Sequence, residues 1–300
     1  MNILVVGAGA IGTLFGVRLS QHNTVCFFVK PSQTALLQNQ GFILTGNTKK
    51  HMHLPVAHSV RSIPFIPDVI LLAVKAYDTD IVMQSLKPVL SKKTVILSLQ
   101  NGLDNYDTIQ RYVASSQIIG GITTHGAYLV SPGVVRHTGI GTTILGEIRR
   151  TKTKRVVHLA SVLRKAGIQT HTTTHVQKAL WEKAIINSSI NPLTALFSCK
   201  NGYLLRNPVL ETLVKQICVE STQVARSSKI PVTSSVMIRK TVMVIQETAQ
   251  NYSSMAQSIQ KKKKTEIDSI NGIIVRLGKR KGENVSINEL LVRVIHMLSQ

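Results

Sequence analysis

The sequence predicts an α/β protein in which a doubly wound sheet is followed by an all-α C-terminal domain. Short aliphatic runs alternate with helical patterns as far as residue 172, and beyond it strand patterns disappear while helical periodicity dominates. A glycine-rich segment lies between the first strand and the first helix, as in Rossmann-type sheets. The length of 300 residues and the hydrophobic content of 43% are enough for two cores. We therefore expect a Rossmann-type domain over residues 1–172 and a helical domain over residues 173–300.

The first strand–turn–helix unit predicts a dinucleotide site. Residues 3–6 form a short aliphatic run that leads directly into G-A-G-A-I-G and then into a helical pattern. Gly7 permits the tight turn, Gly9 lets the backbone approach a pyrophosphate, and Gly12 allows the helix to pack closely on the strand. The N-terminus of that helix presents free N–H groups to the anion. We expect the cofactor to contact Gly7, Ala8, Gly9, Ala10, Ile11 and Gly12.

The residue that follows the second strand predicts which dinucleotide is bound. An NAD enzyme normally has an acidic residue here, which holds the 2′-hydroxyl of the adenosine ribose. After the strand at residues 25–29 this chain has Lys30, and a cation suits the 2′-phosphate of NADP. We therefore expect NADPH as the cofactor, and the alternative is a solvated lysine in a lysine-rich chain.

Two further strands end in polar residues. The buried runs at residues 68–74 and 94–99 lead into Lys75 and Asn101. Because ligands bind beyond the carboxyl ends of strands in doubly wound sheets, we expect Lys75 to contact cofactor or substrate and Asn101 to contact nicotinamide or substrate. The alternatives are an ordinary loop cation and an Asn-Gly turn. The segment 131–147 is predicted to add strands and a hairpin that close the sheet.

The histidines and cysteines do not predict a metal centre. His51 and His53 alternate on one face of an expected edge strand, with no carboxylate or cysteine nearby. His125 lies beside glycines, and we expect it to be structural and not to transfer protons. Three cysteines without C-x-x-C spacing fit thiols in a reducing compartment. With neither a secretion signal nor an apolar run long enough to span a bilayer, we expect a cytoplasmic protein.

The net charge of +22 is unusually high. Such a field attracts phosphates, carboxylates and nucleic acids alike, so the charge by itself does not identify a partner. Aromatic residues make up only 4% of the chain, and no helix-turn-helix or zinc-finger spacing occurs. Nucleic-acid binding is therefore not expected.

One helix in the C-terminal half places polar groups on a single face. Lys183, Asn187 and Asn191 are spaced i, i+4 and i+8 between apolar neighbours. A buried amine and two buried amides need partners, which either a substrate or a polar seam between packed helices can supply. Pro192 cannot donate to the carbonyl of Ser188, so we expect the helix to kink or loosen there and to expose carbonyls.

Taken together, these motifs resemble the ketopantoate reductase family, the 2-dehydropantoate 2-reductases of coenzyme A biosynthesis. The resemblance covers nearly the whole chain and is most specific in the C-terminal half. The matching segments are G-A-G-A-I-G at residues 7–12, V-K-A at 74–76, Q-N-G at 100–102, T-T-H at 123–125, L-W-E-K-A-I-I-N-S-S-I-N-P-L-T-A at 180–195, S-S-M at 253–255 and T-E-I-D-S-I-N-G at 265–272.

The resemblance implies roles for individual residues. Lys183 matches the family's catalytic lysine, a general acid, and Glu266 matches its partner carboxylate. Lys75 and Asn101 match groups near the nicotinamide and the substrate. The family usually has an arginine at the 2′-phosphate, where this chain has Lys30. The substrate-binding positions match Asn187, Asn191, Ser254 and Asn101.

We therefore expect NADPH-dependent reduction of 2-dehydropantoate to (R)-pantoate by a monomer or homodimer. Hydride transfer to a 2-keto carbon builds negative charge on its oxygen, which a buried ammonium at Lys183 can stabilise and protonate. One alternative is a related NAD(P)H-dependent reductase of another branched 2-keto acid, which would share every motif. The other is a non-catalytic module that binds NADP or nucleic acid, which would have no need of Lys183 and Glu266.

Overall fold

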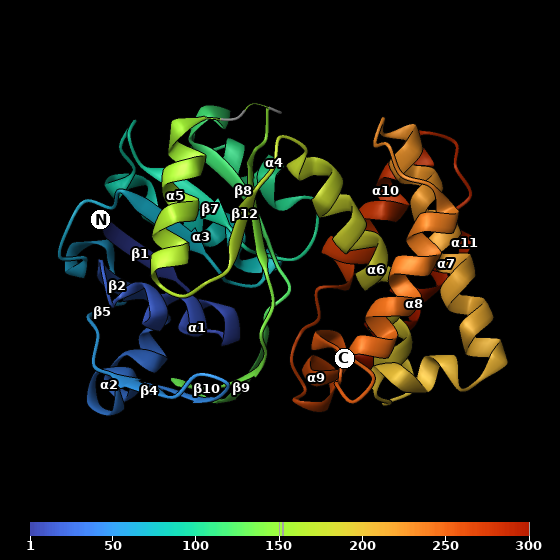
Figure 1. The fold of residues 1–300 in the computed structure, drawn as a ribbon, viewed down its shortest axis with the longest axis horizontal. Coiled ribbons are helices and arrows are strands. Elements are labelled where there is room, and N and C mark those ends of the chain that lie inside the picture. The colour runs from blue at the N-terminus through green and yellow to red at the C-terminus, as the bar shows by residue number, and fades with distance from the viewer. Residues whose placement is uncertain (150, 152, 300) are drawn as a thin grey trace. The chain divides into compact units, whose positions relative to one another are not determined.

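The chain folds into two compact units. The computed structural model describes residues 1–149, 151 and 153–299. The first unit comprises residues 1–100 and 105–176, and the second comprises residues 101–104 and the chain from residue 177 onward. The first unit holds the strands and the second is helical (Figure 1). The short segment 101–104 therefore groups with the helices, although its neighbours in sequence belong to the sheet unit.

An eight-stranded sheet forms the centre of the first unit (Figure 1). Its neighbouring strands are parallel except at one pair, residues 143–147 with residues 118–123. In spatial order the strands are β12 (Thr170–Thr172), β11 (Thr143–Glu147), β8 (Ile118–Thr123), β7 (Val95–Ser98), β6 (Val69–Leu72), β1 (Asn2–Val6), β2 (Thr24–Phe28) and β5 (Val56–Ala57). The chain leaves β1 toward β2 on one side and later returns to β6 on the other, so a topological switch point lies beside β1. The predicted doubly wound α/β sheet is confirmed.

Helices connect these strands, and their buried apolar side chains form a core with those of the sheet. The central strands are buried aliphatic runs, as expected for parallel strands covered on both faces. Within this core the rings of Phe27 and Phe42 stack with their centroids 4.0 Å apart. The α-helices of the unit are α1 (Ala10–Leu19), α2 (Pro31–Gln40), α3 (Thr79–Leu86), α4 (Asn105–Gln110) and α5 (Lys154–Lys165).

A second, four-stranded sheet corrects one prediction. The hairpin turn at Ser131-Pro132-Gly133 forms as expected, and residues 143–147 add a strand to the main sheet as predicted, but the hairpin itself lies in the second sheet. The second strand of the hairpin pairs with the first strand along one edge and with a parallel strand near residue 43 along its other edge. It therefore cannot also pair with the main sheet. In spatial order this sheet contains β4 (Lys50–Met52), β3 (Phe42–Gly46), β10 (Val134–Gly139) and β9 (Gly126–Ser131). The predicted edge strand is confirmed as β4, where His51 is exposed, but the strand ends at Met52 and so does not include His53.

The second unit is built from helices packed around buried aliphatic side chains. Its core includes Trp181, Ile185 and Ile274, together with the free thiol of Cys218. A π-helical turn at Asp268–Gly272 leads directly into the next helix. The α-helices are α6 (Val176–Leu196), α7 (Pro208–Ser227), α8 (Ser234–Glu247), α9 (Ser254–Gln260), α10 (Ile273–Arg280) and α11 (Ser286–Leu298). Among the described residues, no helix combines the length and apolar character that crossing a bilayer requires.

Candidate active site

The glycine loop after β1 has the local geometry that a pyrophosphate needs. Gly7 has φ +100°, and a Cβ there would lie 2.9 Å from Cγ1 of Val74. A Cβ on Gly12 would lie 2.0 Å from the carbonyl oxygen of Gly7, so only glycine lets α1 approach the loop this closely. Gly9 differs, because the nearest protein atom would be 3.8 Å from its Cβ. The protein's own packing thus leaves room at Gly9, which fits a glycine kept for a ligand.

Lys30 lies beyond β2, directly before α2, and its side chain is 71% exposed. Its ammonium is 3.4 Å from the carboxylate of Asp78, which ends a 3-10 turn after β6. Lys75 precedes the same turn. Both predicted cations therefore lie at the carboxyl ends of strands beside β1. Asp78 was not among the predicted site residues, because nothing local in the sequence links it to Lys30.

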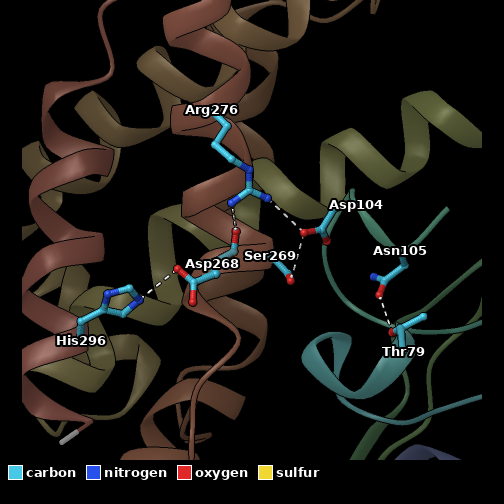
Figure 2. A network of polar contacts seen from close by, with 7 residues as sticks. All are labelled: Thr79, Asp104, Asn105, Asp268, Ser269, Arg276 and His296. Atoms are coloured by element: carbon cyan, nitrogen blue, oxygen red, sulfur yellow. Dashed lines mark hydrogen bonds and ion pairs between the residues drawn. The ribbon is translucent and has the colours of Figure 1, made fainter. Parts of the chain in front are cut away.

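A buried glutamine joins the loops that follow β6 and β7. The Gln100 amide donates to the carbonyl of Val74 at 3.0 Å and to Oγ1 of Thr79 at 2.7 Å. Thr79 in turn donates to Oδ1 of Asn105 at 3.2 Å (Figure 2). The Q-N-G motif thus contains a structural residue, Gln100, which fixes the loop that carries Lys75. Sequence reasoning missed this role, although a polar residue directly after a buried strand is the kind of signal that indicates it.

The segment Asn101–Asp104 contacts the helical unit through several polar groups. The Asn101 amide donates to Oε2 of Glu266 at 3.4 Å. The Asp104 carboxylate accepts hydrogen bonds from Ser269 at 3.4 Å and from Arg276 at 3.1 Å (Figure 2). Gly102 has φ +95°, and a Cβ there would lie 2.6 Å from the carbonyl oxygen of Ser269. The Asn-Gly turn and the functional interpretation of Asn101 are therefore compatible, because the turn brings its amide to Glu266.

Lys183 and Glu266 are oppositely charged groups that interact within the helical unit. Lys183 is half-buried on α6, and Glu266 is 6% exposed. Burial lowers the pKa of the Lys183 ammonium to about 8, while the negative charge of Glu266 acts in the opposite direction. A lysine with this pKa can release a proton far more readily near neutral pH than an ordinary lysine.

Asn187 and Asn191 lie along the same face of α6 as Lys183. Asn191 is buried and Asn187 is half-buried. Neither side-chain amide has a hydrogen-bond partner among the residues that the structure describes. A seam between packed helices would satisfy these amides with protein groups. These amides are therefore available to a ligand or to water.

Pro192 does not interrupt α6, which corrects the expectation of exposed carbonyls. The helix continues to Leu196. The Ser188 carbonyl, which Pro192 cannot satisfy, accepts a hydrogen bond from the buried Asn271 amide at 3.1 Å. Asn271 also donates to Asn288 at 3.0 Å, and Asn288 donates to the Glu220 carboxylate at 2.9 Å. A buried polar chain from α7 through α11 and the π-helical turn thus completes the hydrogen bonding of α6.

The serines of the S-S-M motif have different environments. Ser253 is the N-cap of α9, where its hydroxyl accepts from the Ala256 N–H at 3.1 Å and from Thr194 Oγ1 at 2.7 Å. Ser254 is exposed at the first residue of the helix. Only Ser254 therefore presents a hydroxyl that is available to a ligand.

The histidines are structural or exposed where the structure describes them. His125 is buried, and its Nδ1 lies 3.2 Å from Nε2 of His137 and accepts the Gly141 N–H at 3.3 Å. No group of three or more His, Cys, Asp or Glu side chains suited to a metal ion occurs within residues 1–149, 151 and 153–299.

Two family models match this chain and together span most of it. The model for Ketopantoate reductase PanE/ApbA matches residues 3–150, and the model for its C-terminal part matches residues 175–299. The 2-dehydropantoate 2-reductase of Pyrococcus abyssi is 35% identical over 97% of this chain and 95% of its own length. That of Archaeoglobus fulgidus is 32% identical over 98% and 96%.

Solved structures have the same fold over the whole chain. A ketopantoate reductase from Ralstonia eutropha superposes with a TM-score of 0.88 at 27% identity, covering 100% of this chain and 98% of its own. A ternary structure of D-mandelate dehydrogenase with NADH and anilino(oxo)acetate superposes with a TM-score of 0.93 at 27% identity, with the same coverage. Both are similar to this chain, and the second was solved with a nicotinamide dinucleotide bound.

Proposed function

We propose that this chain, which belongs to the ketopantoate reductase family, reduces 2-dehydropantoate to (R)-pantoate with NADPH. The observation that carries this proposal is the face of α6. Lys183 and the amides of Asn187 and Asn191 line that face, and neither amide has a protein partner among the described residues. A polyhydroxylated keto acid supplies a carboxylate and hydroxyls for such amides and a carbonyl for the lysine.

The cofactor contacts belong to residues 1–172 in this proposal. The loop Gly7, Ala8, Gly9, Ala10, Ile11 and Gly12 binds the pyrophosphate at the N-terminus of α1. Lys30 binds the 2′-phosphate of the adenosine ribose as a point charge, and Lys75 contacts the dinucleotide from the loop after β6. NADPH, when bound, supplies the hydride.

The catalytic groups belong to residues 173–300. The ammonium of Lys183 stabilises the negative charge that develops on the keto oxygen and then donates its proton there. Its pKa of about 8 leaves it mostly protonated at neutral pH, and the nearby Glu266 favours that charged form. Asn101 donates to Glu266 and so connects the carboxylate to the segment after β7. Asn187, Asn191, Ser254 and Asn101 orient the substrate.

Steady-state oxidation of NADPH with 2-dehydropantoate tests this function directly. We expect turnover with this keto acid, and we expect Lys183→Ala to lower kcat by roughly 10²–10⁴-fold because general acid–base catalysis contributes about that much. Unchanged turnover in that variant, or no NADPH oxidation by the wild-type protein, would contradict the proposal.

A second candidate is a reductase of a different 2-keto acid. The similarity to a D-mandelate dehydrogenase with NADH and anilino(oxo)acetate bound favours including aryl and branched 2-keto acids in the same assay. A higher kcat/KM for one of these than for 2-dehydropantoate would identify that substrate class. Binding of NADP or nucleic acid without turnover would instead identify a non-catalytic module.

A further inference from the structure

Lys30 and Asp78 lie on either side of the glycine loop. Strand β1, which leads into that loop, has β2 on one side and β6 on the other. Lys30 follows β2, and Asp78 ends the 3-10 turn that follows β6. The Asp78 backbone N–H donates to the Lys75 carbonyl at 2.9 Å, which fixes the turn. The ammonium and the carboxylate meet at 3.4 Å.

This carboxylate changes what Lys30 offers to an adenosine ribose. An ammonium by itself favours a 2′-phosphate, whereas a carboxylate accepts hydrogen bonds from ribose hydroxyls and repels a phosphate. Here both groups are within ion-pair distance, and the Asp78 side chain is only 24% exposed. A 2′-phosphate that reaches Lys30 must therefore compete with Asp78 for the ammonium and approach a like charge.

We propose that Asp78 is a specificity-determining residue that weakens the preference for NADPH over NADH, an inference that rests on the proposed function and deepens it. Lys30 recognises the 2′-phosphate, and Asp78 recognises the unphosphorylated ribose. The pair allows the chain to bind both dinucleotides. A lysine without this carboxylate would select NADPH more strictly.

The size of the effect follows from the exposure of the pair. Lys30 is largely solvated, so the repulsion between Asp78 and a 2′-phosphate is screened by water. Coulomb's law with a water-like dielectric at a separation of about 5–6 Å gives roughly a fivefold change in affinity. Asp78→Asn should therefore tighten NADPH about fivefold and weaken NADH, since the neutral amide is a poorer acceptor for the ribose hydroxyls.

The test compares dinucleotide binding by nicotinamide fluorescence in the full-length wild-type, Asp78→Asn and Lys30→Gln proteins. The ratio of the NADH to the NADPH dissociation constant should rise in Asp78→Asn and fall in Lys30→Gln. Adenosine 2′,5′-bisphosphate and AMP serve as shorter probes. The ratio of the AMP to the bisphosphate dissociation constant should shift in the same directions. Asp80→Asn is the matched control, because Asp80 lies two residues further on and pairs with Arg111 at 3.6 Å.

A ratio that stays within about twofold of wild type in Asp78→Asn would overturn the inference, since that is less than the expected Coulomb effect. An equal shift in Asp80→Asn would also overturn it, because any nearby carboxylate would then suffice. These measurements need no keto acid. A protein that passes them but fails to reduce 2-dehydropantoate would contradict the proposed function alone, whereas a protein that binds neither dinucleotide would contradict both.

Discussion

Among single residues, the interaction between Lys183 and Glu266 governs how the proposed reaction depends on pH. Burial lowers the pKa of the lysine to about 8, and Glu266 opposes that shift. A general acid must carry its proton, so kcat/KM should fall as the pH rises through this pKa. Glu266→Gln removes the opposing charge, and we expect the falling limb to move to lower pH. Initial rates between about pH 6 and pH 10 measure this shift.

A neighbouring carboxylate provides the control for that pH profile. Glu182 precedes Lys183 and pairs with Lys240 at 2.8 Å. Because the structure gives Glu182 its own cationic partner, Glu182→Gln should leave the limb where it is in the wild type. A limb that moves equally in both variants would mean that general charge, and not Glu266 in particular, sets the pKa of the lysine.

Among the elements, α6 depends on a side chain from outside the helix. Asn271 donates to the Ser188 carbonyl that Pro192 leaves without a backbone donor. Asn271→Ala leaves this buried acceptor unpaired, so we expect a loss of about 2 kcal/mol in the free energy of unfolding of the helical unit. Urea denaturation followed by the fluorescence of Trp181 reports on this unit, since Trp181 lies in its core. Asn251→Ala, at an exposed position, should change it by less than about 0.5 kcal/mol.

The position of the segment Asn101–Asp104 depends on the hydrogen bonds and the ion pair of Asp104. Asp104 holds it to the π-helical turn and to α10 through Ser269 and Arg276. Asp104→Asn weakens the ion pair while keeping the shape of the side chain, so amide hydrogen exchange in this segment should become faster. Lys279→Gln is the control, because it removes a different ion pair of α10, the one with Glu289 at 2.8 Å. Equal exchange in wild type and Asp104→Asn would show that the carboxylate does not hold the segment.

Local patterns predicted the elements better than they predicted their pairing. The strand, glycine turn and helix at residues 3–19 follow from periodicity and from Gly7 and Gly12, which act on their own neighbours. The pairing of β10 with β3 joins Val134 to Ile43, and the local sequence of either strand does not indicate a partner so distant along the chain. Asn271, which donates to the Ser188 carbonyl, could not be predicted either, because it is also distant along the chain.

The candidate site shows the same division between local and distant information. The spacing of Lys183, Asn187 and Asn191 predicted a polar face on one helix, because helical geometry alone fixes it. Only the resemblance to a family supplied Glu266, since that carboxylate lies far along the chain from the lysine. Asp78 could not be assigned from the sequence, because its importance depends on its 3.4 Å distance from Lys30.

For the whole molecule, the net charge of +22 says less about which anion is bound than the positions of individual charges do. A field of that size attracts any anion, whereas recognition depends on where individual charges lie. The charge does affect the balance between folded and unfolded states when further protons bind. The buried histidines His125 and His137 of the sheet unit resist protonation, because burial and the nearby cation of Arg18 lower their pKa values.

These histidines predict that the sheet unit loses stability in mild acid. Burial, the neighbouring His137 and Arg18 lower the pKa of His125 to about 4, and burial with Arg18 lowers that of His137. Unfolded histidines take up protons near pH 6.5, so acid favours the unfolded chain. The stabilisation that the neutral, buried histidines give the folded state is complete above about pH 6.5 and is lost as the pH falls toward about 4, with His125 accounting for roughly 2 kcal/mol by about pH 5.

Thermal unfolding at several pH values should show a weaker pH dependence in His125→Gln than in wild type. His158→Gln, at an exposed histidine of α5, should retain the wild-type dependence, and an identical slope in all three proteins would mean that the buried pair does not control acid stability.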